Sequence, residues 1–546
     1  MPLLIFDKAH LIQLVGKKLS DEQIEEIINK TKTNVERIDE KEIEVEITGE
    51  RIDLFSIEGF ARMLRQFLGL ERGLPRYKVR KSNLKIKVEK VEARPFAACA
   101  IVKNVKLDNK FIKSLIQVQE ILHSNLGKDR KKVAIGLHDF DKIFPPITYT
   151  EISPNAKLVP LGMETELMLV EILEKHEKGI KYGKLVKSFK KWPVFLDKKG
   201  IFSFPPIINS ERTKITKKTK NIFIDVTGLN EDLVDYTLNL LVSIFAERKA
   251  NVESVELIFE NRRKILPNFK PEKFSLNKKE VFDLLGIKLK DREIKELFEK
   301  VGFEAKVLGN KISVMVPFYR KDILHRVDLI EELAIAYGYE NFEPEVPEIA
   351  TIGSFEKIEK ISDKVREVLA SLGLIEVMRP VLTNFSNQFD KMNLERIKCV
   401  ELKNPVSENY TCLRTWLLPS LLEVLSRNKH IEYPQNLFEV GDVVLIDETK
   451  ETKTLTHRKV AGLVCHSKAS FAEIKAIVEV LLNALKVVYK FKNFEHKSFI
   501  EGRCGLIIGN GKEVGIFGEI HPKVLENWEI EMPVAAFEIN LEDLLC

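Results

Sequence analysis

The sequence predicts a multidomain α+β protein, and three observations lead to this fold class. The 546 residues are enough for roughly three to five domains. Hydrophobic residues make up 44% of the chain and charged residues 31%, which is typical of a globular protein with a buried core. Strand-like alternation and helix-like periodicity recur along the whole chain, and the Pro/Glu-rich stretch FEPEVPEIAT, at residues 342–351, is expected to be a linker.

Composition excludes several classes of protein. The formal net charge of +5 is mild for this length, so any contact with nucleic acid must come from local patches. No stretch approaches the ~20 apolar residues of a membrane span, and the first twenty residues are a poor signal peptide. The cysteines lack CxxC spacing, which favours reduced thiols in a cytoplasmic protein over a zinc module or a disulfide scaffold. They are Cys99, Cys399, Cys412, Cys465, Cys504 and Cys546.

Residues 1–80 are expected to form a small N-terminal α/β domain. A short strand and a helix come first, and Ser20 is the expected N-cap of a second helix. After another strand, an amphipathic helix is expected around Phe60. In the simplest interpretation of that helix, Arg62 and Arg65 lie in solvent.

Residues 81–265 are expected to form a second α/β domain, with strands at Leu84–Val88, Ala98–Val102 and Ile222–Val226. The basic run Lys128–Lys132 lies in a loop. A run of charge is more often a solvated loop than a nucleic-acid contact, and we expect the former.

A rigid turn is predicted after a buried strand of this second domain. Pro205 and Pro206 are followed by Asn209, Ser210 and Glu211, so the turn presents polar side chains. Spacing alone does not make this turn catalytic, and no Ser/His/Asp spacing in the chain is diagnostic. The expected positions of His138, His176 and His466 are at the surface or hydrogen-bonded in the core.

Residues 266–345 are expected to form a compact helix-helix-strand module. The two helices are expected at Ser275–Leu285 and Asp291–Phe303, and a strand is expected at Ile312–Val316, where apolar and polar residues alternate. A further helix is predicted from Val327, with Asp328 as its N-cap.

Four carboxylates of this module could share one site. Asp328, Glu331 and Glu332 are expected on one helix face, and Asp322 lies in the loop before it. No lysine stands four residues after Glu331 or Glu332 to neutralise their charge on the helix. Mg²⁺ requires clustered oxygen ligands of this kind. The alternative is that these acids stabilise the first turn of the helix through its dipole.

Residues 346–546 begin with an expected amphipathic helix, Glu356–Leu372, and then alternate strands and helices. The recognisable blocks are NPVSENYTCLRTWLLPSLLEVLSRNKH, QNLFEVGDVV and GIFGEIHPKVLENW.

These motifs together resemble one protein family. The string of Arg320, Asp322, Asp328, Glu331 and Glu332, followed by Tyr337-Gly338-Tyr339, looks like the metal-binding module of the phenylalanyl-tRNA synthetase β subunit. In that family the four matching acidic positions bind magnesium.

Other parts of the chain carry the same resemblance. The run GERIDLF resembles the family signature Asn-Arg-x-Asp-Leu, with Glu50 in place of the asparagine and Arg51, Asp53 and Leu54 matching. The turn after Pro205 resembles the core of the editing domain of archaeal and eukaryotic members. The C-terminal blocks resemble the class II synthetase fold without its active site.

The resemblance implies an α2β2 tetramer whose α subunit uses ATP and phenylalanine to charge tRNA(Phe). The β subunit would supply assembly surface, tRNA contacts and hydrolysis of tyrosyl-tRNA(Phe). A class II site that uses ATP needs a late arginine, and this chain has none after Arg503, so residues 346–546 are expected to be a class II-like antiparallel sheet with helices that is catalytically inactive.

The resemblance also implies an editing site on the turn. Glu211 is the expected acceptor of the tyrosine O–H, and Asn209, Thr213 and Asp225 are expected to line the pocket, with water as the attacking group. Two other classes stay open. One is a nucleic-acid-binding scaffold without enzymatic role, and the other is a free-standing metal-dependent hydrolase built on the four carboxylates.

Overall fold

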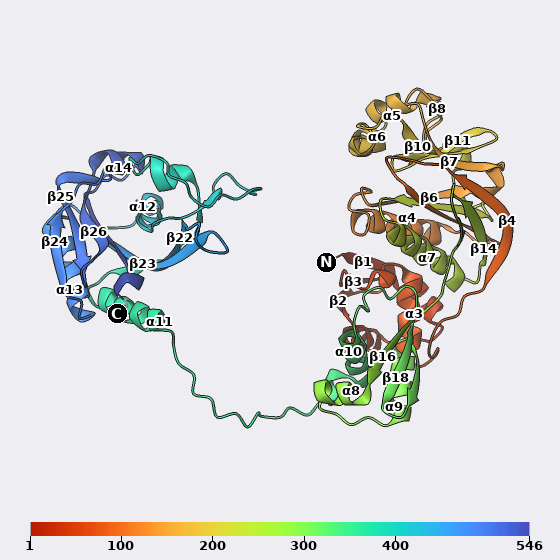
Figure 1. Ribbon diagram of the computed structural model, residues 1–546, viewed down its shortest axis with the longest axis horizontal. Coiled ribbons are helices and arrows are strands. Elements are labelled where there is room, and N and C mark those ends of the chain that lie inside the picture. Colours follow the sequence, from red (N-terminus) through yellow and green to blue (C-terminus); the bar gives the residue numbers. More distant parts are fainter. Residues whose placement is uncertain (1, 545–546) are drawn as a thin grey trace. The chain divides into compact units, whose positions relative to one another are not determined.

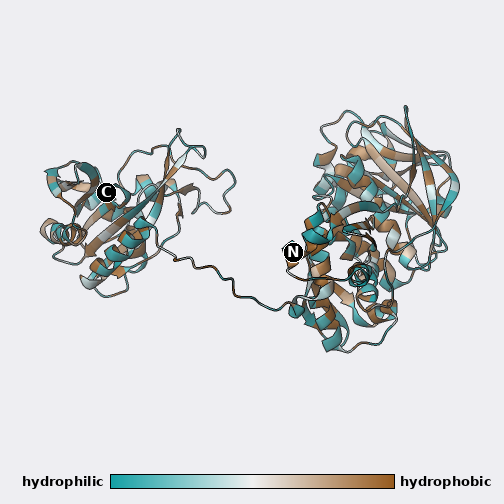
Figure 2. Cartoon of the chain, turned by 60° about the horizontal axis from the view of Figure 1, so that its bottom comes forward, coloured by the Kyte–Doolittle hydropathy of each residue, from teal (hydrophilic) through white to brown (hydrophobic). Residues whose placement is uncertain are grey.

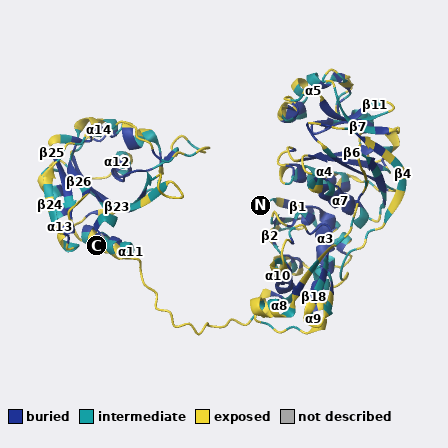
Figure 3. Cartoon of the chain, viewed as in Figure 1, coloured by how far each residue is buried: buried dark blue, intermediate teal, exposed yellow. Residues whose placement is uncertain are grey.

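The computed structural model describes residues 2–544 and divides into two compact units, Met1–Glu345 and Val346–Cys546 (Figure 1). The division falls within the Pro/Glu-rich stretch that was expected to be a linker. Residues 343–356 have no helix or strand, and four apolar side chains spaced by three residues are exposed there (Figure 3). They are Val346, Ile349, Ile352 and Phe355, which are 92%, 68%, 99% and 71% exposed.

The chain begins with a three-stranded antiparallel sheet and three helices. The strands lie in the order β1 (Leu3–Asp7), β3 (Glu42–Ile47), β2 (Thr33–Ile38). The helices are α1 (Lys8–Val15), α2 (Asp21–Asn29) and α3 (Ile57–Phe67). Ser20 caps α2 in a capping box, as predicted. Since every strand pair here is antiparallel, the topology is α+β, which corrects the α/β prediction for this part.

Arg62 on α3 is buried, which contradicts the prediction that it lies in solvent. Its guanidinium group lies 3.8 Å from the centre of the Tyr319 ring and 3.4 Å from carboxylate oxygens of Asp53 and Glu247. A periodicity argument assigned it to the polar face of the helix. The structure buries that face against the end of α7 (Glu231–Glu247) and the loop that contains Tyr319, so Arg62 is satisfied by long-range partners.

The largest sheet follows, and it forms one wall of the candidate site. Its strands lie in the order β12-β11-β10-β7-β4-β14-β5-β13-β6, with β15 added beside β14. Among the described strand pairs of this sheet, only β4–β14 and β4–β7 are parallel, so the second domain is also α+β rather than α/β. The predicted strands are confirmed within β4 (Val79–Val88), β5 (Phe96–Lys103) and β13 (Ile222–Gly228).

The remaining bounds of this domain follow. The strands are β6 (Val133–Asp139), β7 (Ile147–Ile152), β10 (Trp192–Asp197), β11 (Gly200–Phe204), β12 (Ile208–Asn209), β14 (Asn251–Ile258) and β15 (Arg263–Leu266), with a small β8–β9 hairpin (Lys157–Leu158 and Leu167–Met168). The helices are α4 (Asn109–Ser124), α5 (Leu169–Lys175), α6 (Glu177–Tyr182) and α7. Helix α7 packs against β5 and β13 and is mostly buried (Figure 3).

The third part of the first unit corrects the predicted helix-helix-strand order. A strand, β16 (Glu272–Asn277), precedes α8 (Lys278–Leu285) and α9 (Asp291–Lys300). Ser275 was assigned to the first helix, but it pairs with Ser313 on β18 (Lys311–Val316), with β17 (Glu304–Leu308) on the other side. The strand β16 is short and is followed directly by α8. Its pairing partner β18 is distant in the sequence, so local periodicity did not predict the strand.

The second unit is a seven-stranded sheet with helices, as predicted, and it is antiparallel except at its edge strand β19. Its order is β19 (Ile375–Glu376), β22 (Gln435–Ile446), β23 (Thr454–Cys465), β27 (Val534–Asn540), β26 (Lys512–Ile520), β25 (Phe499–Gly509), β24 (Tyr489–Asn493). Helices α11 (Lys357–Ser371) and α13 (Phe471–Ala484) pack on one core, and α12 (Leu418–Arg427) and α14 (Pro522–Asn527) on another. Apolar residues concentrate in the strands of both units (Figure 2).

Two expectations about the chain's environment bear on the described residues. None of the helices between residues 2 and 544 combines the length and apolar character of a membrane span. Five cysteines are free and buried, as expected for reduced thiols, and Cys546 lies outside the described residues.

Candidate functional site

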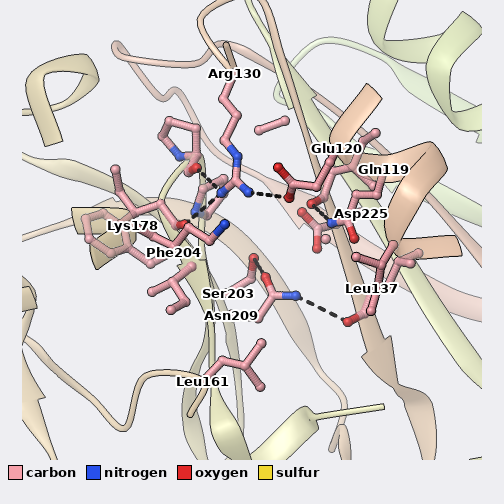
Figure 4. A pocket seen from close by; sticks show the side chains of 18 of the residues that line it. Gln119, Glu120, Arg130, Leu137, Leu161, Lys178, Ser203, Phe204, Asn209 and Asp225 are labelled. Carbon is pink, nitrogen blue, oxygen red and sulfur yellow. Dashed lines mark hydrogen bonds and ion pairs between the residues drawn. The ribbon is translucent and has the colours of Figure 1, made fainter. Parts of the chain in front are cut away.

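A cavity of about 560 Å³ lies in the first unit between α4, β6 and the turn after β11 (Figure 4). Its volume falls in the range of small-molecule sites. Ile112, Leu115 and Ile116 of α4 and Ile135 and Leu137 of β6 give it apolar walls. Polar groups reach it from Gln119, Glu120, Arg130, Ser203, Asn209, Lys178 and Asp225.

Asp225 is the buried carboxylate in the cavity wall. It lies on β13, is 1% exposed, and its Oδ2 is 2.7 Å from Nε2 of His138 on β6. The other ring nitrogen of His138 is 2.9 Å from Oγ1 of Thr213. Buried polar groups need such partners, so His138 fixes the direction in which Asp225 points. The expectation of a hydrogen-bonded core histidine is confirmed, and its link to the predicted site residues Asp225 and Thr213 is new.

Gly136, opposite Asp225 in the β6–β13 register, leaves room for that carboxylate. A Cβ atom at position 136 would lie 2.1 Å from Asp225 Oδ2. We therefore expect Gly136→Ala to displace the Asp225 carboxylate and to destabilise the first unit. Urea unfolding measures the loss, with Gly49→Ala as the control, because no atom lies within 4 Å of a Cβ atom there and its φ angle is not positive. Equal stability of the two variants would contradict close packing of Gly136 against Asp225.

Arg130 closes one side of the cavity and corrects the prediction of a fully solvated basic loop. It is 8% exposed, and Nη1 donates to the carbonyls of Pro206 and Ile207 at 3.2 and 3.0 Å. Its Nη2 donates to Glu120 at 3.1 Å, so one guanidinium joins the Pro-Pro turn to α4. His123, whose Nδ1 lies 3.7 Å from Glu120, and the charge of Arg130 lower the pKa of Glu120 to about 2, which keeps this carboxylate ionised.

The loop that delivers Arg130 is itself held by a second buried arginine. Lys128, Asp129 and Arg130 all have left-handed φ angles, of 45°, 53° and 63°. Such angles cost free energy in non-glycine residues and persist where surrounding contacts impose them. Arg94, 2% exposed, donates to the carbonyls of Arg130 and Lys131, and burial lowers its pKa to about 10.

Glu211 lies beside the cavity rather than in its lining. Its carboxylate accepts hydrogen bonds from the Gly162 N–H at 2.7 Å and from Lys214 at 3.0 Å, and both of those residues line the cavity. Partial burial would raise the pKa of Glu211, but these two partners outweigh it and hold the pKa below its usual value. Of the four predicted residues, Asn209 and Asp225 line the cavity, Thr213 is buried and contacts the far side of the His138 ring, and Glu211 borders the cavity.

The four predicted metal ligands do not converge in this chain. Asp322 and Glu332 both pair with buried Arg320, whose Nε is 2.9 Å from Asp322 Oδ1 and whose Nη1 is 3.1 Å from Glu332 Oε2. Glu331 pairs with Lys32 at 2.7 Å. Asp328 accepts the N–H groups of Leu324 and His325.

Between residues 2 and 544 no group of three or more His, Cys, Asp or Glu side chains is arranged to hold a metal ion. The carboxylates therefore do not fit a preformed Mg²⁺ site within one chain, and magnesium stays a prediction from the resemblance. Helix α10 (Arg326–Tyr337) also begins earlier than predicted, so Asp328 is its third residue and not its N-cap.

Comparison with known families accounts for most of the chain. Residues 84–265 match the B3/4 domain, residues 274–339 the tRNA synthetase B5 domain, and residues 343–541 the phenylalanyl tRNA synthetase beta chain CLM domain. This domain set defines a subunit of an aminoacyl-tRNA synthetase.

Relatives are similar along their full length. Proteins named phenylalanine–tRNA ligase beta subunit from Methanocaldococcus jannaschii and Pyrococcus abyssi are 44% and 43% identical. The first alignment covers 99% of this chain and 100% of the relative, and the second covers 100% of each. A crystal structure of an N-terminal fragment of the Pyrococcus horikoshii phenylalanyl-tRNA synthetase β subunit is 38% identical, with a TM-score of 0.60 over 62% of this chain and 99% of that fragment. The chain belongs to the family of phenylalanine–tRNA ligase β subunits.

Proposed function

We propose that this chain works as the β subunit of an α2β2 phenylalanine–tRNA ligase in the cytoplasm. A catalytic α subunit would bind ATP and phenylalanine and charge tRNA(Phe). Two observations support this division of labour: the full-length relatives carry the β-subunit name, and no arginine follows Arg503 to hold ATP in the second unit. The five free cysteines suit a reducing compartment.

We also propose that the cavity hydrolyses tyrosyl-tRNA(Phe). Tyrosine is phenylalanine plus one hydroxyl, and a hydrophobic synthetic pocket rejects an added hydroxyl by only about a hundredfold. A second site that binds the hydroxyl through a hydrogen bond can discriminate by several powers of ten. The observation that carries this proposal is a mainly apolar cavity with one buried carboxylate, Asp225, in its wall and another carboxylate, Glu211, at its border.

The two carboxylates would take the two polar ends of the amino acid. Glu211, ionised and held by Gly162 and Lys214, would accept the tyrosine O–H. Asp225, fixed by His138, would bind the α-ammonium group that every aminoacyl ester carries. Asn209 donates to the Leu137 carbonyl at 3.2 Å, so its amide is held in the wall between them. Water would attack the ester.

Glu211→Ala tests the specificity role. The assembled enzyme with this change should hydrolyse tyrosyl-tRNA(Phe) about ten- to a hundredfold more slowly, because a hydrogen bond to a charged group contributes about 1.5–3 kcal/mol. Charging with phenylalanine should be unchanged. Glu177→Ala is the matched control, since Glu177 is a carboxylate of the cavity lining with no assigned role. Hydrolysis at the wild-type rate would remove Glu211 from the site.

A further inference from the structure

Lysines recur along α6 (Figure 1) and the segment after it, and the first of them, Lys178, lines the cavity. We call Lys178, Lys181, Lys184, Lys187 and Lys190, which follow at intervals of three residues, the lysine belt. Residues 175–191 contain seven lysines and one glutamate, a formal charge of +6, whereas the whole chain carries +5. Without this segment the formal charge of the chain would be −1.

The local backbone places the lysine belt on the solvent side. Helix α6 continues into a 3₁₀ turn at Gly183–Leu185 and then into irregular turns. The positions between the lysines include Tyr182 and Val186, which are 4% and 0% exposed and pack in the core beneath. Lys178 is half-buried and the other four lysines of the belt are exposed.

The belt is not neutralised within the described part of the chain. No carboxylate between residues 2 and 544 forms an ion pair with a lysine of the belt, and Lys181 instead lies 5.1 Å from the centre of the Tyr182 ring. Lys175, which precedes the belt, does pair with Glu171 at 2.7 Å. Because no carboxylate of the described residues neutralises these closely spaced lysines, their summed positive field is available to an anionic ligand.

The belt is joined rigidly to the cavity. Lys178 lines the cavity, and the ring of Tyr182 also contacts Arg130, whose guanidinium carbon is 4.5 Å from the ring centre. Gly179 lets α6 pack closely on α5, because a Cβ there would lie 1.9 Å from the Ile172 carbonyl oxygen. Any ligand that extends out of the cavity on this side meets the lysine belt.

We propose that the lysine belt binds the phosphates of the tRNA acceptor end whose aminoacylated terminus enters the cavity. This inference rests on the hydrolytic function proposed above. An aminoacyl ester on RNA is continuous with a polyanion, so the strand that leaves the cavity must pass its mouth. Lysines that neutralise phosphates release counterions, and this release drives binding. An acidic protein would not need a path that begins at a small-molecule cavity.

The test uses the assembled enzyme with the triple substitution Lys184→Gln, Lys187→Gln and Lys190→Gln, which leaves Lys178 and the cavity intact. In a plot of the logarithm of tRNA(Phe) affinity against the logarithm of salt concentration, the slope should become shallower by about 2–3. Each lost phosphate contact accounts for about 0.7–0.9 of this change. The KM for tyrosyl-tRNA(Phe) should rise at least tenfold, and the hydrolysis rate at saturation should be unchanged. Hydrolysis of tyrosyl-adenosine, which has no phosphates, should also be unchanged.

The control is the triple substitution Lys490→Gln, Lys492→Gln and Lys512→Gln, three exposed lysines of the second unit. If the belt variant has the same salt slope and KM as this control, the proposal is overturned. It is also overturned if the belt variant hydrolyses tyrosyl-adenosine as poorly as it hydrolyses tyrosyl-tRNA(Phe), because that result would show a change in cavity shape. If wild-type enzyme hydrolyses neither substrate but the belt variant still loses salt slope, the hydrolytic function fails and binding of RNA by the belt stands.

Discussion

Arg320→Met is expected to destabilise the first unit by about 3–5 kcal/mol, the cost of removing one partner of a buried ion pair. Arg320 and Glu332 are 3% and 1% exposed, and the substitution leaves Glu332 with its charge buried. Burial alone would raise the pKa of Glu332, but Arg320 lowers it. Because that pKa is lowered on folding, the stabilisation is present above the unfolded value of about 4.3 and is lost as the pH falls through the folded value. Urea unfolding at pH 7 and at pH 4 measures both effects, and the variant should differ less from wild type at the lower pH.

Arg326→Met is the matched control for Arg320→Met. Arg326 lies six residues further along the same segment and pairs with Glu280, but its side chain is 58% exposed. An exposed pair of this kind contributes about 0–1 kcal/mol. Equal losses in the two variants would mean that burial of Arg320 does not govern the stability of this unit.

Asp225→Asn is expected to lower kcat/KM for hydrolysis at least a hundredfold for both tyrosyl-tRNA(Phe) and phenylalanyl-tRNA(Phe). The change keeps the shape of the side chain and removes the charge that would bind the α-ammonium group common to both substrates. A buried charged hydrogen bond that loses its charge costs about 3 kcal/mol, which is about a hundredfold. Rates of hydrolysis at several substrate concentrations give the measurement.

Comparison with Glu211→Ala separates the role proposed for Asp225 from the role proposed for Glu211. Glu211→Ala should affect the tyrosyl substrate alone, whereas Asp225→Asn should affect both substrates. Aminoacylation by the same preparations reports whether the tetramer is intact. If Asp225→Asn instead changes only the tyrosyl substrate, the two carboxylates have exchanged the roles proposed here.

Local signals in the sequence were sufficient for most elements of the fold. Ser20 and the three residues after it contain the whole capping box of α2, and the alternation of Ile222–Val226 is enough to place β13. The strand β16 was missed because its support comes from Ser313 and neighbours on β18, about forty residues later in the chain. Nothing in its own six residues distinguishes it from the start of α8.

Some residues of the candidate site could likewise be predicted from the sequence, and others could not. Asn209 and Asp225 could be predicted because a resemblance marked the turn and the strand. Arg130 and Arg94 could not, since a basic loop is usually solvated and only the fold shows that Arg130 reaches the carbonyls after Pro205. For the carboxylates near α10, the sequence predicted a shared site, but the structure pairs three of them with basic side chains. Four acids in a short stretch suggested one shared ligand. In the structure Arg320, from the same loop as Asp322, pairs with Asp322 and Glu332, and Lys32, from the start of the chain, pairs with Glu331.

The apolar residues spaced by three in the linker bear on how the cell treats an unassembled copy of this chain. Val346, Ile349, Ile352 and Phe355 are exposed in a segment without helix or strand, between two units that each have their own core. Proteases cut extended, accessible backbone in preference to folded elements. A copy whose linker no partner covers therefore presents an apolar cleavage site between two intact halves.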